Sequence, residues 1–214
     1  MENFTLPTQS VVYVMDAYCG WCWGFAERMA EFEAANRDRL AFTVLSGGLL
    51  VGDRVTNIGS LSFIPDANTR ITQITGAEFG APYRALVEDG SYVMNSLDAA
   101  AGLAALRAQA PERAVHWAHA VQSAFFMEGR NLSDPATIAN IATAHGLDAK
   151  RVLQELGDGT AHAQAENDFA IAHQVLQVNS YPTLLYINGN QGYKLPATGT
   201  PLATLNQHLD QLLA

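Results

Sequence analysis

The chain has 214 residues, of which 49% are hydrophobic and 15% are charged, and its formal net charge is −9. This composition is typical of an ordered globular protein that can bury a full core, and it excludes an intrinsically disordered chain. The acidic balance argues against nucleic acid as a partner, because phosphates attract Lys and Arg. No apolar run approaches the roughly 20 residues of a membrane-spanning helix, so a membrane is not an expected partner either.

The first part of the chain predicts a strand, a helix and a second strand. Residues 11–16 form an apolar run that is typical of a buried strand. Residues 23–37 repeat apolar side chains at helical spacing, and residues 40–45 predict the next strand. A strand, a helix and a strand in short succession form a βαβ unit, whose two strands lie parallel to each other.

The middle of the chain is predicted to be helical. Residues 50–68 are mixed and rich in turns, and helical periodicity dominates beyond them. Asp134 and Asp148 are the expected caps of two helices, and Gly146 fits the position just past the end of the first. The other helices are expected over residues 99–108, 111–127 and 161–176.

The last part of the chain predicts a β-hairpin and a final helix. Residues 183–187 have strand character, residues 188–190 form a turn, and residues 193–195 supply a second short strand. Pro201 then starts a helix whose leucines recur at helical spacing. The predicted order is therefore βαβ, a helical block, and ββα.

Cys19 and Cys22 are the only cysteines, and only Gly20 and Trp21 separate them. A Cys-x-x-Cys motif between a strand and a helix is the redox signature of a thioredoxin-like site. Unpaired N–H groups and the helix dipole favour a thiolate at the start of a helix, and the thiolate is the form that attacks disulfides. We therefore expect Cys19 to be the nucleophile and Cys22, one turn further on, to be the resolving thiol.

Two other uses of the cysteine pair are a structural disulfide and half of a zinc site. Zinc needs about four ligands, and no other cysteine or nearby histidine supplies them, so no metal is expected. His116 and His119 share a helix face, but without a neighbouring carboxylate we expect surface residues rather than a metal pair. Residues 1–7 show neither the basic start nor the apolar stretch of a secretory signal, which predicts a cytoplasmic protein. Thiols are kept reduced there, which favours catalytic cysteines over structural ones.

Several stretches resemble the DsbA-like branch of the thioredoxin superfamily, and specifically its cytoplasmic FrnE-type members. The cysteine motif within residues 15–23 carries most of this resemblance, and residues 46–49 and 180–184 support it. Residues 125–134 resemble the helix-loop-helix of the insertion in the same family. The resemblance implies an α/β fold class: a thioredoxin-like fold with a large all-helical insertion between its two halves.

The resemblance also divides the chain. Residues 1–60 and 173–214 are expected to form the discontinuous thioredoxin-like domain, and residues 61–172 the helical insertion. The insertion is expected to act as a lid and a wall for the substrate rather than as a site of chemistry.

The family pattern further implies roles for residues around the cysteines. DsbA itself has a Pro-His centre, whose histidine helps to stabilise the thiolate, whereas Trp21 brings bulk and no titratable charge. We therefore expect Gly20 and Trp21 to make the pair a weaker oxidant than DsbA. An exposed Trp21 is an expected apolar contact for the substrate. Trp23 is either a further contact of this kind or a packing residue.

Pro182 stands where this superfamily has a cis-proline facing the disulfide, and its alternative is an ordinary trans turn proline. A cis bond exposes the backbone of Tyr181, which we expect to pair with an extended substrate segment. Asp16 lies at the end of the first strand, where a carboxylate is able to accept the proton of Cys22. Its alternative is a polar strand end that is hydrogen-bonded to a loop. Gly47 and Gly48 either permit a close backbone approach to the active-site loop or form only a turn.

The sequence thus predicts a protein disulfide oxidoreductase or isomerase that exchanges disulfides with protein thiols through Cys19 and Cys22. No resident cofactor is expected, and glutathione is a candidate redox partner. One alternative is a glutathione-dependent isomerase or transferase of the same superfamily, although that group usually has a serine in place of Cys19. Another is a non-enzymatic adaptor that presents client proteins to a protease. The direction of electron flow, the client proteins and the oligomeric state do not follow from the sequence.

Overall fold

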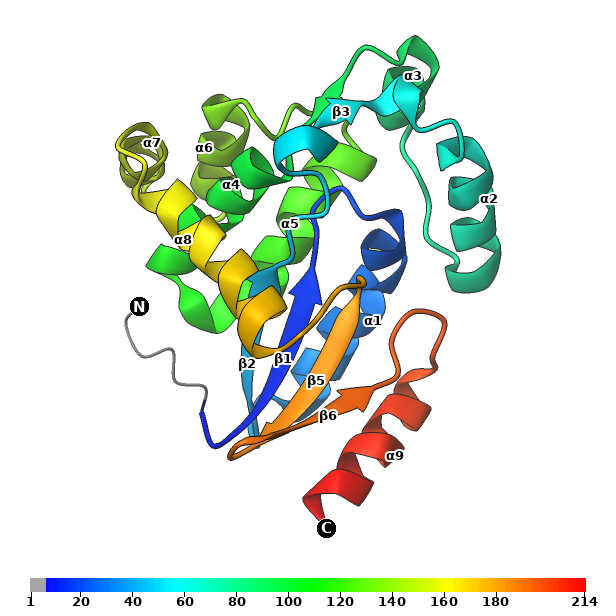
Figure 1. Cartoon of the computed structure of the whole chain (residues 1–214), viewed down its shortest axis with the longest axis vertical. Coiled ribbons are helices and arrows are strands. Elements are labelled where there is room, and N and C mark those ends of the chain that lie inside the picture. Colours follow the sequence, from blue (N-terminus) through cyan, green and yellow to red (C-terminus); the bar gives the residue numbers. More distant parts are fainter. Residues whose placement is uncertain (1–6) are drawn as a thin grey trace.

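The computed structural model of the protein describes residues 7–214. The segment from which a cytoplasmic protein was expected therefore lies, apart from Pro7, outside the described residues. Within the described part, a four-stranded sheet is surrounded by helices, and the helices between residues 64 and 170 gather at one end of it (Figure 1). The predicted order of βαβ, a helical block and ββα is confirmed.

The sheet has the strand order β2-β1-β5-β6. β1 (Gln9–Met15) is parallel to β2 (Ala41–Ser46), as the βαβ unit predicted. β5 (Thr183–Asn188) is antiparallel to both β1 and β6 (Gln191–Leu195), and β5 and β6 form the predicted hairpin. The sheet is therefore mixed, with β1 and β5 at its centre.

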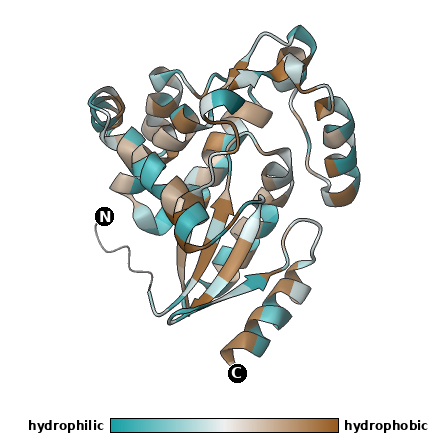
Figure 2. Ribbon diagram, viewed as in Figure 1, coloured by the Kyte–Doolittle hydropathy of each residue, from teal (hydrophilic) through white to brown (hydrophobic). Residues whose placement is uncertain are grey.

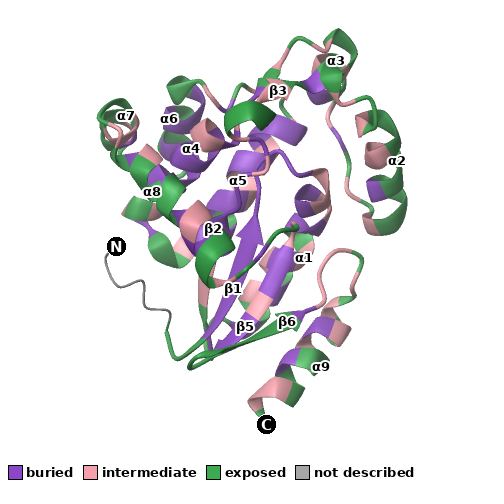
Figure 3. Cartoon of the chain, in the orientation of Figure 1, coloured by how far each residue is buried: buried purple, intermediate pink, exposed green. Residues whose placement is uncertain are grey.

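β1 is buried on both faces, which explains its nearly continuous apolar run. Val11, Tyr13 and Met15 belong to the main core, whereas Val12 and Val14 belong to a second, smaller core on the other face. Hydrophobic residues dominate β1 and β5, but β6 at the edge of the sheet is mostly hydrophilic and exposed (Figures 2 and 3). This pattern fits an edge strand that faces water.

Helices cover both faces of the sheet. α1 (Gly20–Asn36) and α9 (Leu202–Leu213) pack together and contribute to the main core. The other face is covered by η4 (Ile171–Val175), a π-helical continuation of α8, which lies in front of the strands in Figure 1. The remaining helices belong to the helical block: α2 (Ile64–Thr75), α3 (Ala81–Asp89), α4 (Ser96–Gln109), α5 (Ala114–Phe126), α6 (Pro135–Ala144), α7 (Ala149–Gly157) and α8 (Thr160–Ala170).

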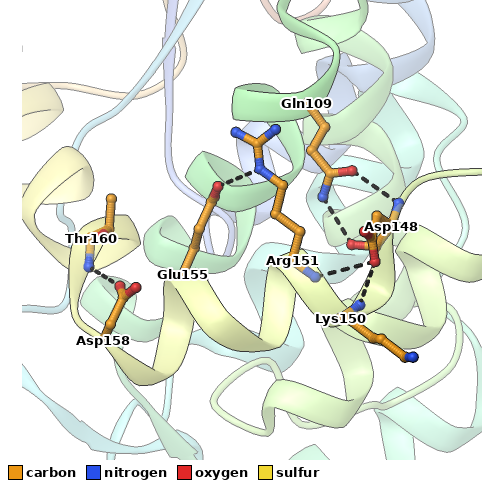
Figure 4. A network of polar contacts seen from close by, with 7 residues as sticks. All are labelled: Gln109, Asp148, Lys150, Arg151, Glu155, Asp158 and Thr160. Atoms are coloured by element: carbon orange, nitrogen blue, oxygen red, sulfur yellow. Dashed lines mark hydrogen bonds and ion pairs between the residues drawn. The ribbon is translucent and has the colours of Figure 1, made fainter.

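Local capping signals identified two of these helices correctly. Asp134 accepts a hydrogen bond at the start of α6, and Gly146 adopts a positive φ of 77° just beyond its end. Asp148 caps α7 by accepting bonds from the N–H groups of Lys150 and Arg151 (Figure 4). Side-chain caps of this kind satisfy N–H groups that have no partner within the helix.

A two-stranded sheet between β3 (Thr56–Asn57) and β4 (Val93–Met94) was not predicted. It links residues 56–57, which were expected in the thioredoxin-like domain, to residues 93–94 of the expected helical insertion. Short 3₁₀ turns η1 (Gly52–Arg54), η2 (Ile58–Ser60) and η3 (Pro111–Arg113) complete the connections. The domain boundaries at residues 60 and 173 stay predictions.

A buried ion pair fastens the helical block to the sheet. Arg107 on α4 donates to Asp168 on α8 over 2.6 Å, and it also donates to the carbonyl of Val44 on β2. Asp168 in turn accepts the N–H of Ser46, at the end of β2, over 3.2 Å. The pair therefore holds the last residues of β2, which lead directly into the candidate site.

Candidate active site

Cys19 is the residue at which α1 begins. Its carbonyl accepts hydrogen bonds from the N–H groups of Cys22 (3.0 Å) and Trp23 (3.1 Å), while its own N–H donates to the carbonyl of Asp16 (3.1 Å). The predicted position of this sulfur at a helix N-terminus is confirmed, and the helix begins slightly earlier than residue 23. The Cys19 side chain makes no capping hydrogen bond to the first turn, although a helix N-terminus in general favours a negative charge.

The two cysteines differ in how deeply they are buried. Cys19 is 8% exposed, whereas Cys22 is completely buried. Burial raises the pKa of the Cys22 thiol, and the neighbouring Cys19 raises it further. Cys19 also lines the cavity beside the site, whereas Cys22 does not, which fits the division between an attacking and a resolving thiol.

Tyr181 and Pro182 lie directly opposite Cys19. The Tyr181–Pro182 peptide bond is cis, as the resemblance predicted. The Cys19 thiol donates to the Tyr181 carbonyl over 3.6 Å, and the Tyr181 hydroxyl donates to the carbonyl of Gly47. A Cβ atom on Gly47 would overlap the Tyr181 ring, so glycine permits this close approach. The structure therefore brings residues 15–23, 46–49 and 180–184, which carried the resemblance, together at one site.

Asp16 is a junction between three segments of the chain. One of its carboxylate oxygens accepts from the N–H of Tyr18 (3.0 Å) and from the hydroxyl of Ser96 (3.1 Å). The other accepts from the N–H of Leu49 over 2.8 Å, and Ser96 also accepts from the N–H of Leu50. This buried carboxylate thus joins the cysteine loop, the segment after β2 and the start of α4.

Burial raises the pKa of Asp16, while its bonds to Leu49, Tyr18 and Ser96 and the charge of Arg54 work in the opposite direction. The geometry fits the alternative that the sequence left open, a polar strand end bonded to a loop. A role in accepting the proton of Cys22 stays a prediction. The contact between Ser96 and Asp16 was not predicted, because nothing in the sequence around Ser96 distinguishes it from an ordinary residue at the start of a helix.

A cavity of about 220 Å³ opens beside Cys19. Trp21, which is half-buried, and the largely exposed Phe63 contribute to its wall. Gly20 also lines it, and a Cβ atom there would lie 2.9 Å from the end of the Ile71 side chain on α2, which would have to shift. The other apolar side chains of the wall are Leu49, Leu50, Leu61, Ile64, Met94, Phe125 and Phe126.

Trp23 is largely buried and packs against the helical block. It is 8% exposed, its Nε1 donates to the carbonyl of Glu78 over 2.8 Å, and its ring stacks on Phe126 at 5.7 Å. Residues two positions apart on a helix point to different sides, so Trp21 and Trp23 have different surroundings. These contacts fit the packing alternative, and a substrate contact of Trp23 stays a prediction.

The histidines of α5 do not meet at a common site. His116 contacts His145 over 3.2 Å, whereas His119 packs beside the ring of Trp23. Among residues 7–214, no group of three or more His, Cys, Asp or Glu side chains is arranged to hold a metal. None of the helices in the same range is both long and apolar enough to cross a membrane.

Comparisons with known proteins agree with this arrangement. A family model described as the DSBA-like thioredoxin domain matches residues 10–212. The cytosolic disulfide reductase DsbM from Pseudomonas aeruginosa superposes with a TM-score of 0.80 at 22% identity, covering 96% of this chain and 100% of that one. The same reductase with GSH gives a TM-score of 0.77, with the same identity and coverage.

Two further solved structures are similar. A "putative protein disulfide isomerase" from Nitrosomonas europaea has a TM-score of 0.81 at 20% identity, with 96% of this chain and 97% of that chain covered. A "probable DsbA oxidoreductase" from Streptomyces coelicolor has a TM-score of 0.71 at 20% identity, with 96% and 90% covered. A search of the curated proteins finds no match.

At these identities the solved structures establish the thioredoxin-like fold with its helical insertion. The family model, which spans nearly the whole chain, establishes more. The chain belongs to the family of DSBA-like thioredoxin domains.

Proposed function

We propose that the protein is a thiol–disulfide oxidoreductase or isomerase that acts on protein thiols, with Cys19 as the nucleophile and Cys22 as the resolving thiol. One observation carries this proposal: Cys19, which lines the cavity just before α1, has its sulfur 3.6 Å from the Tyr181 carbonyl, and Cys22, one turn further on, is completely buried. Such a pair presents one sulfur to a client and keeps the other for the intramolecular step.

In the reducing direction, the Cys19 thiolate attacks one sulfur of a client disulfide. A bond forms between Cys19 and that sulfur, the client S–S bond breaks, and the other client sulfur leaves as a thiolate. The Cys22 thiolate then attacks Cys19, which releases the client as a second thiolate and leaves the Cys19–Cys22 disulfide. Two electrons have moved from the cysteine pair to the client, and each step also runs in reverse.

The surroundings of Cys19 favour a protein client with an apolar side chain beside its cysteine. The cavity next to Cys19 is walled mainly by leucines and aromatic rings, and Trp21 stands half-exposed at its edge. Transferring apolar surface out of water favours binding there. We further propose a cytoplasmic location with glutathione as the redox partner, which is supported by the likeness to the cytosolic reductase DsbM and by its structure with GSH.

Two alternatives remain outside this proposal. A glutathione-dependent isomerase or transferase of the same superfamily does not need a second sulfur, whereas Cys22 is present and lies next to Cys19. A non-enzymatic adaptor needs neither sulfur. The cysteine pair therefore separates the three functions experimentally.

The test compares Cys19→Ser and Cys22→Ser with the wild-type protein, using a client that carries a mixed or scrambled disulfide. We expect Cys19→Ser to abolish exchange, and Cys22→Ser to accumulate a covalent client adduct that mass spectrometry detects. Glutathione-dependent isomerisation that survives in Cys22→Ser would favour the first alternative. Client binding without exchange, unchanged in Cys19→Ser, would favour the adaptor.

A further inference from the structure

Tyr13 carries a buried hydroxyl that lacks a hydrogen-bond partner. The side chain is 2% exposed and lies on β1, with its ring packed edge-on against Phe25 of α1 at a centroid distance of 6.0 Å. In the part of the chain that the structure describes, only the Tyr13 hydroxyl, the Nε of Arg107 and the hydroxyl of Tyr186 are buried side-chain atoms without a partner. A buried polar group of this kind is destabilising, so phenylalanine would suit the position better unless another state of the protein supplies a partner.

Tyr13 belongs to the same buried core as the two active-site cysteines. Phe25 follows Cys22 by three residues on α1, so both lie on the face of the helix that packs against Tyr13. Burial is the largest cause that raises the pKa of Tyr13, and the charges of Cys22 and then Cys19, when ionised, are the next. Tyr13 and Cys22 thus share one buried cluster, and the Cys22 side chain raises the pKa of Tyr13 both by its charge and by hydrogen bonding, although the hydroxyl has no partner at full hydrogen-bond geometry.

The Cys22 thiolate has little other support. Burial is the largest cause that raises the pKa of Cys22, followed by the neighbouring Cys19, and the charge of Asp16 raises it as well. Only a backbone hydrogen bond with Asp16 lowers this pKa. Disulfide exchange nevertheless forms this thiolate in every turnover. The attack of a client thiolate on Cys19 breaks the Cys19–Cys22 bond, and the bonding electron pair stays on the Cys22 sulfur.

We propose that the Tyr13 hydroxyl is the hydrogen-bond donor that stabilises the Cys22 thiolate during disulfide exchange. This inference rests on the proposed function and adds a residue to its mechanism. The Tyr13 hydroxyl lacks an acceptor and the Cys22 thiolate is poorly stabilised, so a hydrogen bond between them would favour both. Hydrogen bonds to charged groups are stronger than those between neutral groups. Because burial raises the pKa of Tyr13, its proton stays on the phenol oxygen, and Tyr13 acts by donating a bond rather than by losing a proton. In the opposite direction, the same bond holds the Cys22 thiolate ready to attack a mixed disulfide at Cys19.

The test is Tyr13→Phe, with Tyr186→Phe as the matched control. Tyr186 is also fully buried and its hydroxyl also lacks a partner, but it lies on β5 opposite Val11. The oxidised proteins are reduced with glutathione, and the resolution of a mixed disulfide at Cys19 is followed in a single turnover. Loss of a hydrogen bond to a charged group corresponds to a rate that is lower by roughly tenfold or more. We therefore expect the rates of reduction by glutathione and of mixed-disulfide resolution to fall by about that factor in Tyr13→Phe and to stay unchanged in Tyr186→Phe.

A second readout separates this inference from the proposed function. In a Cys19→Ser background, the absorbance of the Cys22 thiolate is titrated with and without Tyr13→Phe, which needs no exchange activity. We expect the titration of Cys22 to move to higher pH in Tyr13→Phe and not in Tyr186→Phe. Equal titrations and rates within twofold would overturn the role of Tyr13, as would a Tyr13→Phe protein that fails to fold. A wild-type protein that exchanges no disulfide would refute the proposed function. The titration of Cys22 would still test whether Tyr13 stabilises its thiolate.

Discussion

The buried ion pair between Arg107 and Asp168 offers a perturbation whose size follows from its surroundings. The Arg107 side chain is 13% exposed and the Asp168 side chain only 1%. Without Arg107, the Asp168 carboxylate keeps one N–H donor from Ser46 at 3.2 Å and one amide donor from Gln164 at 3.3 Å. Arg107→Met would therefore leave a buried charge with two neutral donors and no counter-ion.

Removing one partner of a buried ion pair costs about 3–5 kcal/mol. For a chain of this size, 1 kcal/mol shifts the Tm by about 2–4 °C, so we expect Arg107→Met to lower the Tm by roughly 6–20 °C at pH 7. Burial raises the pKa of Asp168, while the charge of Arg107 lowers it. Removing Arg107 would therefore raise the pKa of Asp168 further. A group with a raised pKa stabilises the fold below its unfolded pKa of about 3.9, and this contribution is lost as the pH rises through the folded value. The deficit of the variant should therefore shrink as the pH falls from 7 toward 5.

Thermal unfolding followed by circular dichroism at pH 7 and at pH 5 measures both effects. Arg151→Met is the matched control, because it breaks a 2.7 Å ion pair with Glu155 on the surface helix α7, in which the arginine side chain is 53% exposed (Figure 4). Surface pairs contribute about 0–1 kcal/mol, so the control should lose no more than about 4 °C. The reasoning would be refuted if Arg107→Met lost no more than the control, or if its deficit were the same at both pH values.

Two further predictions concern the site. Because burial raises the pKa of the Cys22 thiol, resolution of a mixed disulfide at Cys19 should accelerate as the pH rises above 7, and single-turnover release of the client measures it; a pH-independent rate would contradict this. A Cβ atom on Gly47 would displace the Tyr181 ring, so Gly47→Ala should slow exchange by about tenfold or more, whereas Gly157→Ala, which meets no atom within 4 Å, should not; equal rates would contradict the positioning role of Gly47.

The sequence predicted the features that depend on neighbouring residues. The apolar run of β1, the caps at Asp134 and Asp148 and the hairpin of β5 and β6 each follow from a few consecutive residues. The cysteine motif was equally local, and its position at the start of α1 followed from the strand before it and the helix after it. The cis bond before Pro182 followed only from the family resemblance.

The rest depends on contacts between distant residues, for which a single sequence carries no signal. Ser96 reaches Asp16 and Arg107 reaches Asp168 only because the helical block folds back onto the sheet. Trp23 was ambiguous for the same reason, since only the packed structure buries its ring against Phe126. The pairing of β3 with β4 involves two residues on each side, too few to produce an alternating pattern.

The central claim is that Cys19 and Cys22 form one reversible redox couple, and its most direct test is the equilibrium of the protein with glutathione buffers of graded poise. Alkylation and mass spectrometry count the free thiols at each poise. We predict that both thiols appear and disappear together, with a midpoint clearly more negative than the value of about −120 mV for DsbA, because Trp21 offers no charge to stabilise the reduced form. Independent titration of the two thiols, or a midpoint near −120 mV, would contradict the account.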